Sequence, residues 1–169
     1  MTDGVEVTLA PWPLEAARRL VAGLAPDDAD TVRWHPDHPS GDVVDALALA
    51  LGAHQVDGRL TEVPPWWVHE IRYAGEVVGE AGFHGPPAAD GPVEVEIGYS
   101  VVPALQGQGI GTRACALLLT LAWRAGADTV LAVSEPENGA SRTVLHRCGF
   151  RARADGGFAV ARPVAGAHW

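Results

Sequence analysis

The sequence predicts an α+β fold: a central, mostly antiparallel twisted sheet of about seven strands, flanked by about four helices. Several short segments alternate apolar and polar residues, as strands with one buried face do. Longer segments place apolar residues three or four positions apart, as amphipathic helices do. The strand-like segments mostly follow one another and do not alternate with helices, which favours hairpins. With 169 residues, 47% of them hydrophobic, and no linker, we expect one domain over residues 1–169.

The first half of the chain predicts a strand, two helices and a hairpin. The strand covers residues 5–10, and the first helix carries its apolar stripe from Leu14 to Leu24. Loop-forming Pro and Asp residues follow, and then a second helix that ends near Gln55, with Ser40 or Asp42 as its cap. The β-rich stretch 66–85 contains a turn at Ala74-Gly75, which indicates two antiparallel strands.

The second half predicts the last strand of the antiparallel group, a helix, a further strand, a second helix and a final hairpin. Residues 93–102 alternate regularly, and the helix from Gly109 to Arg124 is apolar on two sides, so we expect it to be largely buried. The strand 128–134 has few polar residues and should be central. A short helix that ends at Gly149 precedes the closing hairpin, whose turn is Gly156-Gly157.

Charge and composition exclude several classes of protein. The formal net charge is −9, from 12 basic and 21 acidic residues, which argues against a nucleic-acid partner. No apolar stretch is long enough to cross a membrane, and the first residues lack the pattern of a signal peptide. Cys115 and Cys148 form no CxxC pair and are expected to be buried apolar residues. We therefore expect a cytoplasmic protein.

Three glycines stand at the entrance of the helix that follows the strand 93–102. Gly107, Gly109 and Gly111 lie within the stretch "ALQGQGIGTRA". They could simply form a tight turn. Alternatively, the bare backbone lets an anion approach the unpaired N–H groups of the helix N-terminus, where Arg113 could add positive charge. The run lacks the spacing of a dinucleotide fingerprint and the lysine of a P-loop, so neither nucleotide site is favoured.

The glycine run resembles a known signature. Gln106-Gly107-Gln108-Gly109-Ile110-Gly111 is similar to the Gln/Arg-x-x-Gly-x-Gly/Ala motif of the GNAT superfamily, the acyl-CoA-dependent N-acyltransferases. The later pattern Asn138-x-x-Ser141-x-x-Val144-Leu145-x-x-x-Gly149-Phe150 resembles that family's next motif. It is closest to the branch of ribosomal-protein N-terminal acetyltransferases. The resemblance implies acetyl-CoA as acyl donor and no metal.

The resemblance also implies where coenzyme A binds. Its pyrophosphate would lie on the backbone amides of the glycine turn, and its pantetheine arm would pair with the strand before that turn. This strand would carry a bulge, and the sheet would splay open between the strands 93–102 and 128–134. Asn138 would contact the coenzyme or cap its helix, two compatible roles. The implied binding residues are Tyr99, Ser100, Val101, Gln106, Gly107, Gln108, Gly109, Ile110, Gly111, Thr112 and Asn138.

Two residues are candidates for acid–base catalysis. Glu96 matches a position that faces the active site in many relatives, and Glu94 lies on the same side of that strand. Glu96 is the expected base; alternatively, the pair is a solvated face. Many members carry a tyrosine acid where Leu145 stands here, so Ser141 is the expected substitute unless it is an ordinary helix residue.

The sequence leaves the acceptor amine open. A small amine or amino-acid-like molecule suits the acidic chain, whereas the second motif suggests a protein N-terminus as the alternative. A coenzyme A sensor without turnover is a further alternative, because the usual tyrosine is missing. The residues His35, Asp37 and His38 invite a metal interpretation, but no third His or Cys lies at a suitable spacing. A homodimer is common in the family, although no segment here indicates an interface.

Overall fold

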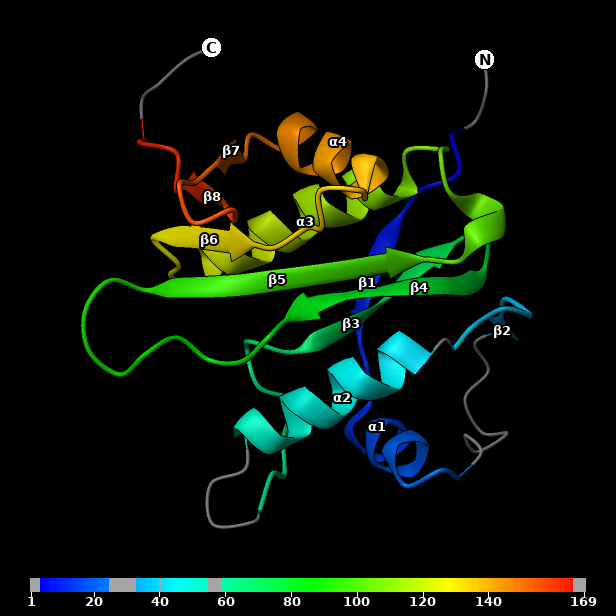
Figure 1. Cartoon of the computed structure of the whole chain (residues 1–169). Coiled ribbons are helices and arrows are strands. Elements are labelled where there is room, and N and C mark those ends of the chain that lie inside the picture. Colours follow the sequence, from blue (N-terminus) through cyan, green and yellow to red (C-terminus); the bar gives the residue numbers. More distant parts are fainter. Residues whose placement is uncertain (1–3, 25–32, 40, 55–58, 166–169) are drawn as a thin grey trace.

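One twisted sheet separates two pairs of helices (Figure 1). The structure is a computed structural model that describes residues 4–24, 33–39, 41–54 and 59–165. Its elements are β1 (Thr8–Pro11), α1 (Leu14–Val21), β2 (Arg33–Trp34), α2 (Gly41–His54), β3 (Val68–Tyr73), β4 (Glu76–Phe83), β5 (Glu94–Val101), a 3₁₀ turn (Pro103–Leu105), α3 (Ile110–Arg124), β6 (Thr129–Ala132), α4 (Gly139–Arg147), β7 (Arg151–Ala152) and β8 (Phe158–Ala161). The sheet follows the order β1-β3-β4-β5-β6-β8-β7, and β2 pairs with β4. These elements confirm the predicted α+β class.

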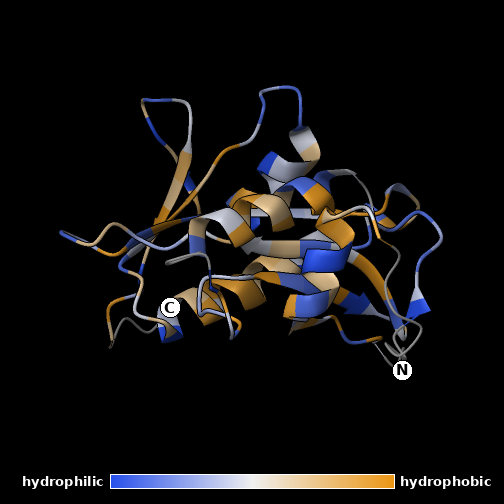
Figure 2. Ribbon diagram, turned by 90° about the horizontal axis from the view of Figure 1, so that it is seen from below, coloured by the Kyte–Doolittle hydropathy of each residue, from blue (hydrophilic) through white to orange (hydrophobic). Residues whose placement is uncertain are grey.

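Helices α1 and α2 cover one face of the sheet, called the α2 face below, and α3 and α4 cover the other, called the α4 face (Figure 1). Each face has its own hydrophobic core. The larger core, on the α4 face, includes Ile97, Ile110 and Leu118, and the smaller includes Trp12 and Leu47. Figure 2 shows hydrophobic residues gathered along the central strands and on the helices packed against them. None of the helices in the described part of the chain has the length and apolarity needed to span a bilayer.

Two expected details of the first half need correction. Strand β2 was expected to be loop, but the backbone of Arg33 and Trp34 pairs in parallel with Glu76 and Val77 of β4. A strand of two residues has no alternation that a sequence pattern could reveal. Asp42 lies inside the first turn of α2 and so does not cap it, and the other expected cap, Ser40, lies outside the described residues.

The expected hairpin is present, and the sheet's irregularity lies within it. Ala74 and Gly75 both have positive φ, 52° and 80°, as a tight turn between antiparallel strands requires. Ile71 faces Gly79 while Arg72 faces Val77, so β4 carries one extra residue. The bulge was expected in the strand 93–102, but β5 pairs with β4 in unbroken register from Ile97 to Val101.

The sheet opens beside the second half of β5. Strand β5 pairs in parallel with β6 only from Glu94 to Ile97, and β6 ends at Ala132, opposite Ile97. The last four residues of β5, from Gly98 to Val101, continue past the end of β6 and keep only β4 as a partner. This geometry confirms the predicted splay between the two strands.

Candidate active site

A cavity of about 480 Å³ occupies the opening of the sheet. Its walls are the end of β5, the glycine turn before α3, one side of α4 along its whole length and one residue of α2, Asp42. Most residues that the sequence singled out come together here. Those that line the cavity are Tyr99, Ser100, Val101, Gln106, Gly107, Gly109, Gly111, Thr112, Asn138 and Ser141.

The glycine turn presents open backbone to this cavity. Gly107 and Gly109 have φ of 79° and 80°, a conformation that other residues adopt only with strain. Gly109 precedes α3 directly, and no side chain caps the helix. A Cβ placed on either glycine would meet only open space. The first amides of a 15-residue helix therefore stay available, which suits an anionic ligand.

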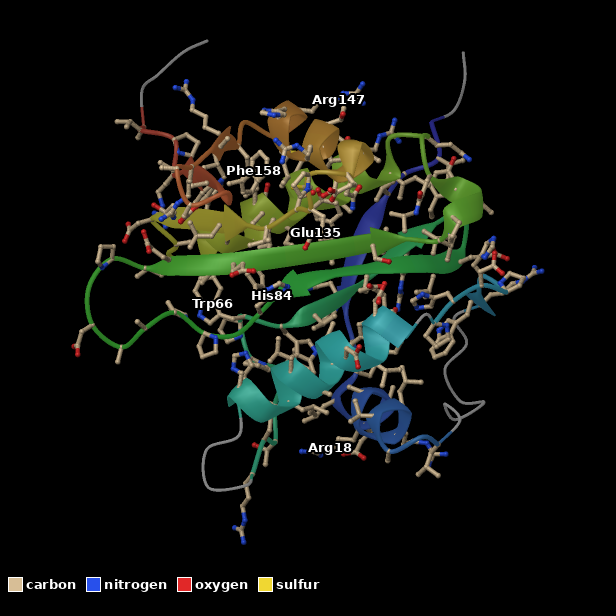
Figure 3. All side chains as sticks on the ribbon, viewed as in Figure 1. Arg18, Trp66, His84, Glu135, Arg147 and Phe158 are labelled. Carbon is tan, nitrogen blue, oxygen red and sulfur yellow. The ribbon has the colours of Figure 1, made fainter. Side chains whose placement is uncertain are left out.

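Two side chains beside the turn also suit an anionic ligand. The hydroxyl of Thr112 is buried and has no hydrogen-bond partner among the described residues, so it can serve a ligand. Arg147, in the last turn of α4, also lines the cavity, and Figure 3 shows it at that helix. The sequence had suggested Arg113 as the cation. Its side chain instead donates to the carbonyl of Val5 and lines a different hollow.

Three expected binding residues have other surroundings or tasks. The Nε2 of Gln106 donates to the carbonyl of Val101 at 2.9 Å and so braces the turn against β5. Gln108 is exposed and Ile110 is packed in the core, and neither lines the cavity. They can contribute through their backbone alone.

A hydrogen-bonded group links β5 to the start of α4. The Oδ1 of Asn138 accepts from the amide of Ser141 at 3.0 Å, so Asn138 is the N-cap of α4. The hydroxyl of Tyr99 lies 3.2 Å from the carbonyl oxygen and from the Oγ of Ser141. Burial raises the pKa of Tyr99 to about 12, so this hydroxyl keeps its proton. Leu145 is buried in the core. The sequence had assigned only the backbone of Tyr99 to the site, and its hydroxyl was missed.

The cavity reaches both faces of the sheet. Tyr99 points to the α4 face, where it contacts Ser141, and the next residue, Ser100, points to the α2 face. Both line the same cavity, and so does Asp42 of α2. A ligand that enters along α4 can therefore meet one that enters from the α2 face.

A buried carboxyl group lies on the α2 face next to Ser100, and the sequence analysis missed it. Glu80 of β4 faces Ser100 in the strand register and is 6% exposed. Burial and, to a smaller extent, the charge of Asp42 raise the pKa of Glu80 to about 7, against the opposing effect of a hydrogen bond with Ser100. Its Oε2 has no partner among the described residues. A glutamate in the middle of a strand with otherwise buried residues was the available signal.

Glu96, the expected base, lies outside this cavity. It also faces the α2 side of β5, but its Oε1 is 3.0 Å from Nδ1 of His84. The ring of His84 covers Gly98, where an added Cβ would be 2.7 Å from Nε2. Figure 3 shows His84 near β5 on the side of α2. Glu96 lines a second hollow together with Glu135 and Phe158. Within the described part of the chain, no three His, Cys, Asp or Glu side chains gather as metal ligands.

The fold and this cavity agree with a comparison against protein families. The model of the acetyltransferase (GNAT) domain matches residues 6–151, most of the chain. The chain belongs to the GNAT acetyltransferase family. This GNAT membership confirms the family expected from the glycine run and the Asn138 motif. A comparison with curated protein sequences gave no significant match.

Solved structures confirm the GNAT fold. RimJ of Mycobacterium smegmatis, solved with CoA-disulfide, has 24% identity and a TM-score of 0.61, over 92% of this chain and 81% of its own. A GNAT family acetyltransferase of Brucella melitensis, solved with acetyl-CoA, has 20% identity and a TM-score of 0.54, over 94% and 90%. A Vibrio cholerae structure assigned as a ribosomal-protein-serine acetyltransferase has 17% identity and a TM-score of 0.55, over 95% and 98%.

Proposed function

We propose that this acetyltransferase moves the acetyl group of acetyl-CoA to a primary amine, by direct attack while both substrates are bound. The observation that carries the proposal is the single cavity that starts at the bare N-terminus of α3 and passes through the opening of the sheet. The Brucella melitensis relative, which holds acetyl-CoA on the same fold, supports the choice of donor.

The residues around the turn fit the donor's phosphates. The amides of the first turn of α3, the unpartnered hydroxyl of Thr112 and the guanidinium of Arg147 are three kinds of anion ligand within one cavity. The open edge of β5 from Tyr99 to Val101 is free of β6 and can pair with the amide groups of the pantetheine arm. Because Gln106 already uses the carbonyl of Val101, this pairing would involve Tyr99 and Ser100 above all.

The two faces of the sheet have different tasks in the reaction. A backbone N–H of β5 polarises the thioester carbonyl, and the amine attacks it from the α2 face. On the α4 face, Ser141 with the Tyr99 hydroxyl supplies a proton to the departing thiolate. The proton acceptor must lie on the α2 face, where Glu96 and Glu80 are the two candidates.

The acceptor best suited to this site is a small cationic amine or an amino-acid-like molecule. Asp42 stands at the α2 side of the cavity, and the net charge of −9 attracts cations over a longer range. The N-terminus of a protein is the second candidate, which the fold likeness to the Vibrio cholerae structure favours.

A panel of acceptors tests the proposal directly. The purified protein is incubated with acetyl-CoA and, in separate reactions, with amino acids, alkyl diamines and short peptides with free N-termini. Thiol release and the mass of the product are then measured. Acetylation of any of these amines is expected. If acetyl-CoA binds but no amine is acetylated, the chain is a coenzyme A-binding module without turnover.

A further inference from the structure

We propose that Glu80, acting through the hydroxyl of Ser100, is the proton acceptor for the attacking amine. This inference rests on the proposed acetyl transfer and adds to it a residue that the family motifs do not contain. The carboxyl group of Glu80 lies behind the cavity wall, has an unsatisfied oxygen and contacts Ser100, a residue of that wall.

The position follows from the strand register. Glu80 faces Ser100 across β4 and β5, so both side chains project to the α2 face. Ser100 lies in the part of β5 that has left β6, and it lines the cavity. Glu80 itself lies behind Ser100 and is 6% exposed. An amine in the cavity therefore meets the serine hydroxyl first, and the carboxyl group through it.

The burial of this carboxyl group is not explained by an ion pair. Its hydrogen bond with Ser100 leaves Oε2 unpartnered among the described residues. The direct neighbour of Glu80 on β3 is Glu70, which is itself paired with Arg72 at 2.7 Å. From α2, Asp42 adds a further negative charge. An uncompensated buried carboxyl group lowers the stability of the fold, and such costs concentrate at functional sites.

The same surroundings suit a proton acceptor. Among the described residues, the groups that face this region from α2, β3 and β4 are the carboxyl groups of Asp42, Glu70 and Glu80 and the guanidinium of Arg72. The excess of negative charge favours a proton on Glu80. The pKa of about 7 keeps part of the Glu80 population ionised near neutral pH, and this is the range in which a general base works best.

The proton transfer balances as follows. A bound ammonium gives one proton to the Oγ of Ser100, while the serine's own proton moves to the carboxylate of Glu80. The neutral amine then forms a bond to the thioester carbonyl carbon. When the tetrahedral intermediate collapses, the carbon–sulfur bond breaks and the thiolate leaves with the electron pair. The thiolate takes a proton from the hydroxyl pair of Tyr99 and Ser141. The nitrogen releases its second proton to water, which reprotonates that pair, and Glu80 later returns its own proton to water.

Glu96 with His84 is the rival candidate for this role. The pair has good geometry, with 3.0 Å between Oε1 and Nδ1, and it lies over Gly98. Both side chains are more than one third exposed, however, and Glu96 opens to the second hollow and not to the cavity that Ser100 lines. Glu80 is the carboxyl group in contact with the cavity wall.

The pH dependence of kcat/KM for the best amine of the panel separates the two candidates. In the wild type we expect the rate to rise up to about pH 7, where Glu80 ionises, and then to level off. Glu80→Gln should lose this plateau, so that kcat/KM keeps rising about tenfold per pH unit with the fraction of free amine. At pH 8, kcat/KM of this variant should be about 100-fold below that of the wild type. Ser100→Ala should show the same profile, and Ser100→Thr should restore the plateau.

The dissociation constant of acetyl-CoA and the melting temperature of each variant show whether the site remains folded. The inference is overturned if Glu80→Gln binds acetyl-CoA normally and keeps the plateau, or if Glu96→Gln or His84→Gln loses it while Glu80→Gln does not. If the wild type acetylates no amine of the panel, the proposed function itself fails, and the inference with it.

Discussion

Replacing Glu80 by glutamine should stabilise the folded protein at pH 8. The pKa of Glu80 is raised from 4.5 to about 7, so the folded state holds this proton more tightly than the unfolded state. Between these two values the stability of the wild type falls as the pH rises. Each unit of pKa corresponds to about 1.4 kcal/mol, so the cost above pH 7 is about 3 kcal/mol. Glutamine has a similar shape and carries no charge, and it avoids this cost.

Urea unfolding at pH 5 and pH 8 measures the effect. At pH 5 ionised Glu80 already costs the wild type a small part of this free energy. The increase in unfolding free energy from wild type to Glu80→Gln should therefore be about 2.5 kcal/mol larger at pH 8 than at pH 5. Comparing the variant with the wild type at the same pH cancels the contributions of the other titrating groups to the unfolding free energy. This holds if the denaturant dependence is the same in both proteins. A gain that is equal at the two pH values would refute the reasoning, because it would show that Glu80 titrates in its ordinary range.

Three further predictions concern other residues. Arg147→Gln should weaken acetyl-CoA binding about tenfold, by loss of a cation that lines the cavity, while the matched variant Arg113→Gln, whose side chain lies elsewhere, should leave the dissociation constant unchanged. Burial, together with the charge of His35, lowers the pKa of His38 to about 4. The free energy of unfolding of the wild type should therefore fall by about 3 kcal/mol as the pH falls from 6.5 to 4. Urea unfolding of His38→Gln should show a smaller decrease over this range, and an unchanged decrease would contradict the assignment. Asn138→Ala removes the cap of α4 and should lower the free energy of unfolding, measured with urea, by about 1 kcal/mol. An unchanged free energy of unfolding would show that the cap contributes little.

The sequence predicted most of the fold because its strands and helices have clear periods. Regular alternation located β5, and the spacing of apolar residues located α3. The turn at Ala74 and Gly75 was located correctly, and both residues adopt the positive φ that this turn requires. Strand β2 escaped prediction because it owes its existence to an open edge of β4, a property of the assembled sheet.

The position of the cavity residues was predicted where local backbone geometry defines it. A glycine-rich helix entrance and an Asn cap are features of a few consecutive residues, and the structure places both at the cavity. The roles proposed for Arg147 and Glu80 depend on which residues the fold brings next to the turn and to Ser100. Arg113 was misjudged for the same reason: a position in the first turn of a helix does not determine the direction of a long side chain.

Calorimetric titration with acetyl-CoA tests most directly whether the glycine turn is the donor site. The proteins compared are the wild type, Gly109→Val, and Gly126→Val at the other end of α3, where the glycine also has positive φ and open space. The two substitutions strain the backbone alike, but only the first places a side chain at the cavity. We expect Gly109→Val to raise the dissociation constant at least tenfold, about 1.4 kcal/mol, and Gly126→Val to leave it unchanged. Absence of binding in the wild type, or equal binding by all three proteins, would contradict this expectation.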